Sequence, residues 1–187
     1  MLLLVGLGNP GSNYTNTRHN IGFKIIDAIN AHFKLSKQKP KFKGLLTTGN
    51  IDEKKIYAIK PLTFMNNSGT AIKELIDYFK IDAKDVFVFH DDMDIDFGKI
   101  KAKFGGSSAG HNGIDSIDKF IGKDYSRVRI GIGHPKQKKK VNNHVLEDFK
   151  EDEEEKINEI TENIVKQLPT LIKKKIDLFS SKVNHDL

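Results

Sequence analysis

Short apolar runs along the chain predict the buried strands of a sheet. Residues 2–5 (LLLV) and 86–90 (VFVFH) are nearly continuous apolar runs, which is typical of strands covered on both faces. Residues 44–48 and 55–60 flank a polar turn at 50–53, and this arrangement predicts a pair of neighbouring strands. Since this pair has the pattern of a hairpin, the sheet is expected to contain antiparallel as well as parallel neighbours.

Two further stretches alternate polar and apolar residues and predict strands with one polar face. The stretches are residues 99–104 (KIKAKF) and 127–132 (RVRIGI). Successive side chains of a strand point to opposite faces, so Arg127 and Arg129 are expected on the same face.

Apolar residues at helical spacing predict the helices. The pattern covers roughly residues 20–34, 71–79, 114–121 and 147–168, and acidic residues crowd the first turns of the last helix, where the helix dipole favours them. Pro169 is expected to break that helix before a final apolar stretch. Three polar residues could cap the second helix: Asn66, Asn67 and Ser68.

Strands and helices alternate along the chain, with no internal repeat and no linker. This order predicts an α/β fold, in which residues 1–187 form a single domain. We expect a mixed, twisted sheet flanked by helices on both faces.

Composition restricts the class of protein. The chain has 187 residues, of which 37% are hydrophobic and 30% charged, so it can form a core. No apolar run approaches the roughly 18 residues of a membrane-spanning helix, and the start of the chain does not resemble a secretion signal. The absence of cysteine excludes disulfides, thiolate metal sites and a cysteine nucleophile. We therefore expect a soluble, cytoplasmic protein.

The positive charge is unevenly distributed. Residues 1–146 carry 24 lysines and arginines against 14 acidic residues, whereas residues 147–187 carry 7 against 11. A basic body of this kind favours a polyanionic partner, although lysine used for solubility would give a similar excess. Clusters at residues 37–43, 99–103 and 136–140 favour nucleic acid slightly.

Polar segments follow the predicted strands or open the predicted helices. They are residues 9–11, 18–20, 66–69, 90–92 and 111–113. Ligand sites of open α/β sheets lie outside the carboxyl ends of the strands. The segments at 9–11 and 90–92 occupy such ends directly, and the others are expected to converge on them.

A glycine pattern in the first segment resembles a dinucleotide-binding loop. Residues 6–11 (GLGNPG) fit the spacing of that motif and follow a strand. The motif also needs a helix that begins at the loop, whereas residues 12–17 (SNYTNT) are polar and non-periodic. We therefore expect no nicotinamide cofactor.

An acidic run resembles the opening of a calcium loop. Aspartates occupy positions 92, 94 and 96, but Gly98 comes one place too late and Lys103 occupies the place of the bidentate glutamate. We interpret the run as a turn, with no metal site.

His19 and Asp91 are the candidates for chemistry. Four serines are available as nucleophiles, but none lies in a strained nucleophile elbow: Ser12, Ser68, Ser107 and Ser108. The remaining chemistry is a histidine that activates water directly, an aspartate that orients it, and asparagine amides that hold a carbonyl group.

Six segments in register resemble bacterial peptidyl-tRNA hydrolases. The resemblance as a whole runs from residue 2 to about residue 149. The segments are 5–11 (VGLGNPG), 14–22 (YTNTRHNIG), 61–69 (PLTFMNNSG), 90–92 (HDD), 110–113 (GHNG) and 127–133 (RVRIGIG). The resemblance implies a monomeric, cofactor-free, cytoplasmic esterase that cleaves peptidyl-tRNA, with no membrane and no obligate protein partner.

The resemblance also implies roles for individual residues. It places the catalytic base at His19, its partner at Asp91, and the asparagine that recognises a blocked amino group at Asn9. Contacts to the tRNA or peptide ends correspond to Tyr14, Phe64, Asn66 and Asn112. Contacts to tRNA phosphates correspond to Lys103 and Arg129. Either Asn66 or Asn112 could donate to the developing oxyanion.

Two other functions fit parts of the pattern. A non-catalytic RNA-binding module would use the same basic face, but it would have no need for a buried base. A general esterase or amidase would use the same histidine and aspartate without a nucleic-acid partner.

Overall fold

The computed structural model describes residues 1–137 and 141–185, and these form one mixed sheet with helices on both sides. The strands are β1 (Leu2–Gly6), β2 (Lys39–Lys41), β3 (Gly44–Ile51), β4 (Lys54–Pro61), β5 (Val86–Asp92), β6 (Ile100–Phe104) and β7 (Ser126–Gly131). Their order in the sheet is β2-β3-β4-β1-β5-β7-β6. The central strands β4, β1, β5 and β7 are parallel, and the antiparallel pairs lie at the two sides.

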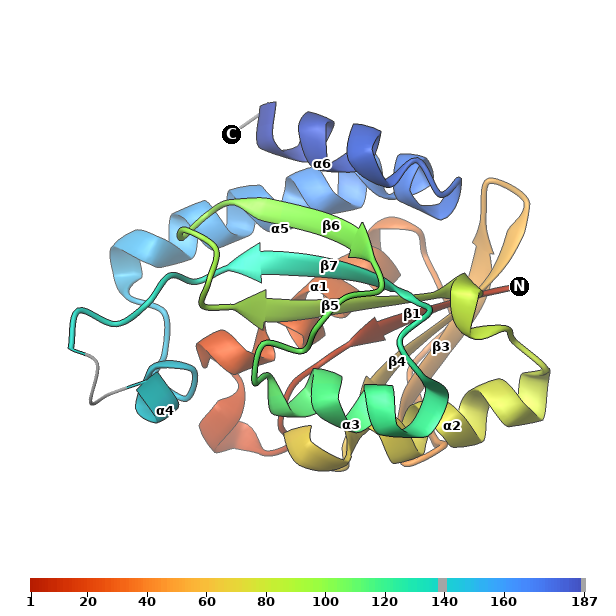
Figure 1. Ribbon diagram of the computed structural model, residues 1–187. Helices are drawn as coiled ribbons and strands as arrows, with labels where there is room; N and C mark the ends of the chain where they lie inside the picture. The colour runs from red at the N-terminus through yellow and green to blue at the C-terminus, as the bar shows by residue number, and fades with distance from the viewer. Residues whose placement is uncertain (138–140, 186–187) are drawn as a thin grey trace.

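Helices cover both faces of the sheet (Figure 1). The α-helices are α1 (Ile21–His32), α2 (Ser68–Phe79), α3 (Asn112–Ile121), α4 (Val141–His144), α5 (Glu151–Ile172) and α6 (Ile176–His185). α2 and α3 lie together on one face, α1 and α5 pack against each other on the opposite face, and α6 packs on α5 and β6. The predicted α/β fold, its mixed sheet and its two helical layers are confirmed.

The alternating side chains of β1 supply both halves of the core. Leu2 and Leu4 pack among the residues of α1 and α5. Leu3 and Val5 pack among the residues of α2 and α3. All four are buried, which explains why the strand is an uninterrupted apolar run.

The predicted strand pair is a hairpin in which β3 and β4 run antiparallel from Gly44↔Pro61 to Ile51↔Lys54.

The side chains of β6 follow the predicted alternation of buried and exposed positions only in part. Ile100 is buried and Lys101 is exposed, but Phe104 is also exposed. Because β6 is an edge strand, its last apolar side chain extends beyond the layer that covers its neighbours.

The prediction that Pro169 breaks the long helix is wrong. α5 begins at Glu151 and continues through Pro169 to Ile172. A proline removes one backbone hydrogen bond, but the core-facing stripe continues past it with the buried residues Leu168 and Leu171. Packing of this face therefore holds the last turn helical. The four acidic residues expected at the helix start do lie in its first turn.

The predicted side-chain cap of α2 is also wrong. Asn67 occupies the cap position without a side-chain hydrogen bond to the helix. The Ser68 hydroxyl donates to the carbonyl oxygen of Met65 at 2.8 Å instead. A short 3-10 turn, Met65–Asn67, leads into the helix, and the side chain of Asn66 is exposed next to the end of β4.

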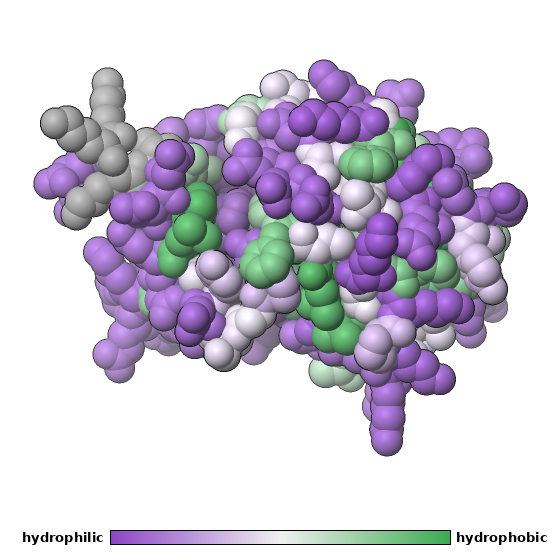
Figure 2. Space-filling view, turned by 90° about the horizontal axis from the view of Figure 1, so that it is seen from below, coloured by the Kyte–Doolittle hydropathy of each residue, from purple (hydrophilic) through white to green (hydrophobic). Residues whose placement is uncertain are grey.

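The surface seen from below in Figure 2 is mainly hydrophilic, with separate hydrophobic patches near its middle. Within the part of the chain that the structure describes, each helix is too short or too polar to span a membrane.

A missing side chain at Gly22 allows α1 to sit directly on two strands. A methyl group at this position would lie 2.3 Å from the backbone nitrogen of Leu7 and 2.5 Å from the carbonyl oxygen of Phe89. These atoms belong to the strand ends that carry the polar segments, so the close contact fixes the helix start relative to them.

We predict that Gly22→Ala lowers the free energy of unfolding by about 3 kcal/mol, because the added methyl group meets backbone that cannot move away. Gly49→Ala is the matched control, since its methyl group would meet the end of the flexible Leu35 side chain. We expect it to cost at most about 1 kcal/mol. Urea denaturation measures both values, and equal losses would contradict the role of Gly22.

Candidate active site

The candidate site lies at the carboxyl ends of β1 and β5, between the two central strands. β1 leads to α1 on one face of the sheet, whereas β5 leads through β6 to α3 on the other face. Such a reversal opens a crevice at the strand ends, which is where α/β proteins bind ligands. The loop after β1 carries His19, and the end of β5 carries Asp91.

His19 and Asp91 form a buried hydrogen-bonded pair. The Nδ1 atom of His19 lies 2.8 Å from Asp91 Oδ1 and 2.9 Å from Oδ2. Asp91 is 1% exposed and His19 7%. Burial by itself raises the pKa of Asp91, but His19 and His111 outweigh it and hold that pKa well below its ordinary value. Asp91 is therefore an anion that accepts hydrogen bonds.

His111 is a second imidazole on the same carboxylate, and sequence reasoning did not assign it a role. Its Nε2 atom lies 2.9 Å from Asp91 Oδ1. Its Nδ1 atom accepts the backbone N–H groups of Gly113 and Ile114, at the start of α3. These two donors require a lone pair on Nδ1, so neutral His111 carries its proton on Nε2 and donates it to Asp91.

The hydrogen bonds also determine which nitrogen of His19 can accept a proton. Nδ1 donates to the ionised carboxylate of Asp91, so the lone pair of neutral His19 is on Nε2. This nitrogen can accept a proton from water, and Asp91 stabilises the imidazolium that forms.

His19, Asp91 and His111 together place nitrogen and oxygen atoms that could bind a metal within 4.8 Å of one another. Two imidazoles and a carboxylate are common metal ligands. A metal on Nε2 of His111, however, would move its proton to Nδ1, where two backbone N–H groups already point. The donor set therefore fits hydrogen bonding to a carboxylate better than metal coordination.

His90 is a buried neighbour of the pair. Its Nδ1 atom donates to the carbonyl oxygen of Asp91 at 2.7 Å, and its ring packs edge-on against that of His111. Burial and the nearby His111 lower the pKa of His90 to about 3, so it is neutral at physiological pH.

Asn9 is held from two sides. Asn20 accepts the backbone N–H of Asn9 at 2.8 Å and donates to its carbonyl oxygen at 2.9 Å. The side-chain oxygen of Asn9 accepts the backbone N–H of Met65, also at 2.8 Å. The side-chain amide nitrogen of Asn9 can therefore still contact a ligand, to which it would donate a hydrogen bond.

The remaining candidates from the N-terminal half are Tyr14, Phe64 and Asn66. Tyr14 and Phe64 meet edge-on with ring centroids 6.5 Å apart. Phe64 is half exposed and has φ 59° and ψ 158°, a conformation that costs a non-glycine residue about 1–3 kcal/mol. It directs the next backbone N–H, that of Met65, toward Asn9. Asn66 follows and is exposed.

Asn112 lies on the other side of the histidine pair. It lines a cavity of about 90 Å³ together with His19, Asp91 and His111. The cavity has room for a few water molecules. The structure therefore brings the His19–Asp91 pair and the amide of Asn112 around a single small space.

Lys103 and Arg129 lie on neighbouring strands, on the same face. The Arg129 guanidinium donates to Asp92 Oδ2 at 2.8 Å and is thereby paired. Lys103 pairs in register with Arg127, and its ammonium group packs over Gly106. Burial and the positive charges of Arg129 and Arg127 lower the pKa of Lys103. An anion bound here would therefore stabilise the charged form of the lysine.

Arg127 shares a strand face with Arg129 but is fully buried. It donates to Asp118 at 2.9 Å and to the carbonyl oxygen of Ser107 at 2.8 Å. It therefore anchors the glycine-rich loop beside Lys103 and is not free to bind a ligand.

Arg18 ties the histidine loop to the segment before α5. It is buried, and its guanidinium donates to Glu153 at 3.0 Å and lies over the ring of Phe149. The backbone of His19 donates to the carbonyl oxygen of Val145 at 2.8 Å. The C-terminal segment thus covers the loop, a contact that local sequence patterns did not reveal.

Neither the glycine loop nor the acidic run has the structure of the motif that its sequence resembles. After residues 6–11 the chain forms 3-10 turns, and α1 begins only at Ile21, so no helix opens at the glycine loop. In the acidic run, Asp92 accepts the backbone N–H of Asp94, whose own carboxylate pairs with His134. This is the turn expected from the sequence.

The basic clusters are dispersed over the molecule. Residues 39–41 form the edge strand β2, at the opposite side of the sheet from β6. Residues 99–103 lie along β6 and the turn before it. Of the cluster at 136–140, Lys138, Lys139 and Lys140 lie outside the described residues.

Comparison with known proteins supports one family. The sequence model of the family described as peptidyl-tRNA hydrolase matches residues 3–187. A peptidyl-tRNA hydrolase of Pelagibacter ubique is 71% identical over 99% of this chain and 100% of the relative. The chain belongs to the peptidyl-tRNA hydrolase family. A relative of the same name from Ehrlichia ruminantium is 46% identical over 97% of this chain and 93% of its own length.

A solved structure agrees with this membership. The crystal structure of peptidyl-tRNA hydrolase from Acinetobacter baumannii has a TM-score of 0.92 to this chain at 34% identity, covering 98% of this chain and 94% of that one. The resemblance identified from the six segments is thereby confirmed at the level of family and fold. The family's C-terminal part, which the segments did not cover, is included in this match.

We predict that His111→Asn lowers kcat about 10- to 100-fold, because Asp91 loses a hydrogen bond from one of its two donors. Asparagine can still cap α3, but loss of the hydrogen bond to the buried carboxylate should also lower the free energy of unfolding by about 1.5–3 kcal/mol. His134→Asn, at an exposed histidine paired with Asp94, is the control and should stay within about twofold of the unmodified enzyme. Unchanged kcat in His111→Asn would contradict a role for the second imidazole.

Proposed function

We propose that this chain hydrolyses the ester bond between a peptide, or an N-blocked amino acid, and the 3′ end of tRNA. Such a reaction recycles peptidyl-tRNA released prematurely from ribosomes. The observation that carries the proposal is the buried Asp91 carboxylate, which orients His19 at the strand ends where the family's polar segments meet. Membership of the family supports the identity of the substrate.

His19 acts as the general base in this proposal. Its Nε2 atom takes a proton from a water molecule while the water oxygen attacks the ester carbonyl carbon. The tetrahedral intermediate then collapses, and the bond between that carbon and the ribose oxygen breaks. The imidazolium returns its proton to the leaving ribose oxygen, which gives a free peptide acid and a tRNA with a free terminal hydroxyl. The reaction needs no metal or other cofactor.

Asn112 is the better candidate for stabilising the oxyanion. It lines the same small cavity as His19 and Asp91, whereas Asn66 lies next to Met65 on the Asn9 side. One donor to a developing oxyanion contributes roughly 10²–10³ in kcat. Asn66 is then left to contact the peptide, near Tyr14 and Phe64.

Asn9 supplies selectivity for a blocked amino group. Because its side-chain oxygen is occupied by Met65, it offers N–H groups to the ligand. These can donate to the carbonyl oxygen of a peptide bond, but a free ammonium group has no acceptor for them. An unpaired buried donor costs about 1–3 kcal/mol, which is enough to disfavour unblocked aminoacyl-tRNA.

Lys103 is the principal phosphate contact in the proposal, and Arg129 the secondary one. Arg129 already bonds Asp92, whereas the charges closest to Lys103 are mainly positive. Contacts of this kind recognise tRNA through its backbone and not through its base sequence.

The proposal also covers the location and the oligomeric state of the protein. We infer a cytoplasmic enzyme that works as a monomer and needs no protein partner. Its tRNA substrate is a cytoplasmic molecule, and the groups required for the chemistry are all present within this one chain.

The deciding experiment compares an N-acetyl-aminoacyl-tRNA with its unblocked twin. We predict that the unmodified protein cleaves the blocked substrate preferentially and that His19→Ala loses about 10²–10⁴ in kcat while tRNA binding persists. His32→Ala, at the far end of α1, is the control. Full activity of His19→Ala would refute the base, and tight tRNA binding without cleavage by the unmodified protein would indicate an RNA-binding module. Cleavage of a small acyl ester as fast as that of the N-acetyl-aminoacyl-tRNA would indicate a general esterase.

We predict that Lys103→Ala raises KM about tenfold at low salt and reduces the slope of log KM against log salt by about one, with kcat nearly unchanged. Arg129→Ala should raise KM less, because its guanidinium is shared with Asp92. Lys84→Ala, in the 3-10 turn before β5 and away from the site, is the control. A loss confined to kcat would show that Lys103 serves the chemistry instead.

A further inference from the structure

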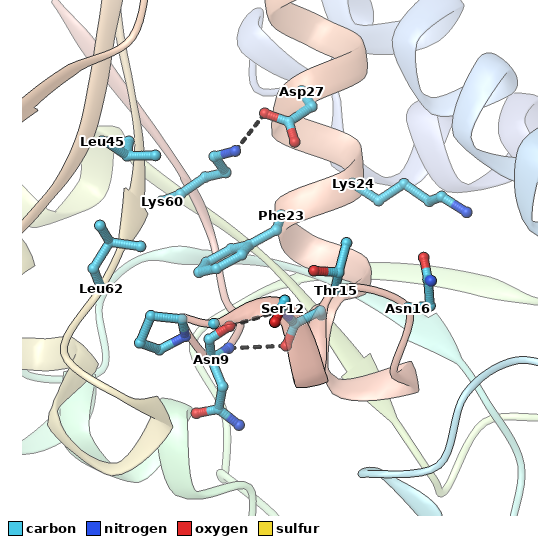
Figure 3. Close-up of a pocket in the computed structure, with 13 residues that line it drawn as sticks. Asn9, Ser12, Thr15, Asn16, Phe23, Lys24, Asp27, Leu45, Lys60 and Leu62 are labelled. Carbon is cyan, nitrogen blue, oxygen red and sulfur yellow. Dashed lines mark hydrogen bonds and ion pairs between the residues drawn. The ribbon is translucent and has the colours of Figure 1, made fainter.

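A second and larger cavity opens behind the loop that carries Asn9 (Figure 3). Its volume is about 490 Å³, within the range of pockets that bind small ligands. We call it the Phe23 groove, and the residues that define it are Asn9, Pro10, Phe23, Leu45, Lys60 and Leu62. The catalytic scheme described above does not use it.

The walls of the Phe23 groove are largely apolar. Figure 3 shows the ring of Phe23 facing Leu45 and Leu62 across the groove. Phe23 comes from α1, and the two leucines come from β3 and the chain just after β4. Leu62 is 38% exposed, so it offers apolar surface to a ligand without being part of the core. Such walls favour apolar side chains.

The charges around the groove are already paired within the protein. Lys60 Nζ lies 2.6 Å from Asp27 Oδ1, which also accepts a hydrogen bond from Gln38. Lys24 lies 3.6 Å from Glu154. Neither lysine is available to neutralise a phosphate without breaking its ion pair. The groove is thus unlike the surface around Lys103, and its chemistry disfavours the tRNA backbone.

Asn9 lies between the groove and the proposed site. The backbone of Asn9, fixed by its two hydrogen bonds to Asn20, lines the groove, and Figure 3 shows its amide pointing away from the groove. A peptide whose first amide bond meets that side chain therefore has the groove on the other side of the same loop. Such a peptide would pass over Pro10, and three extended residues span about 10 Å.

We propose that the Phe23 groove binds apolar side chains of the substrate's peptide, two to four residues before the esterified one. This inference rests on the proposed hydrolysis of peptidyl-tRNA and adds a preference to it. The tRNA phosphates and the peptide then leave the catalytic pocket in different directions, toward β6 and β7 and toward β3 and β4 respectively.

The test uses three substrates on the same tRNA: N-acetyl-Ala, N-acetyl-Gly-Gly-Gly-Gly-Ala and N-acetyl-Leu-Leu-Leu-Gly-Ala esters, in which the varied residues stand two to four places before the esterified alanine. We expect the unmodified enzyme to show a kcat/KM about tenfold higher for the leucine peptide than for the glycine peptide. Leu62→Asp should remove this advantage and leave the N-acetyl-Ala substrate within about twofold. Leu62→Ser, which adds no charge, should reduce the advantage in the same direction.

Leu178→Asp is the matched control, because Leu178 is 43% exposed on α6, away from the groove. It should keep the full leucine advantage, and melting temperatures verify that each variant is folded. An equal loss on all three substrates in Leu62→Asp would overturn the proposal and assign the groove to the tRNA end. An unchanged leucine advantage in that variant, or no advantage in the unmodified enzyme, would also overturn it. Failure to cleave N-acetyl-Ala-tRNA at all would instead reject the proposed function.

Discussion

The rest of the site depends on one buried anion. The carboxylate of Asp91 is almost inaccessible to water, and it is stabilised by hydrogen bonds from two imidazoles, those of His19 and His111. A buried charge without such donors would be very unfavourable. Because the donors come from the loop after β1 and from the start of α3, the same interaction that keeps Asp91 ionised also assembles three distant parts of the chain.

Each imidazole is itself fixed by backbone contacts. His111 caps α3 with its other nitrogen, which determines its tautomer. The backbone N–H of His19 bonds Val145, and its neighbour Arg18 is held by Glu153 of α5. The proton-accepting nitrogen of His19 is therefore aimed by a support that extends from β5 to the C-terminal helices. The proposed direct attack by water requires such preorganisation, since that mechanism has no covalent intermediate.

Charge is divided across the crevice in a way that suits a substrate with two unlike parts. On the β6 and β7 side, Lys103 lies among mainly positive neighbours and is the phosphate contact that we propose. On the β3 and β4 side, Lys60 is paired with Asp27 beside apolar walls. A polyanion and a peptide joined at one ester bond can therefore be directed to opposite sides, with Asn9 at the junction.

The sequence by itself determined the class of fold, the two-sided core and the segments that form the site, because these depend on local periodicity and on residues that follow strands. It also singled out His19 and Asp91. Only the tertiary structure decided that His111 shares the carboxylate and that Asn9 presents a donor. It also decided that Arg129 is paired with Asp92, whereas Lys103 has no ion-pair partner among the described residues. The tertiary structure also decided that α5 continues through Pro169. Hydrogen-bond partners and the packing that overrides a local helix breaker are set by residues far apart in the chain, so no local pattern contains them.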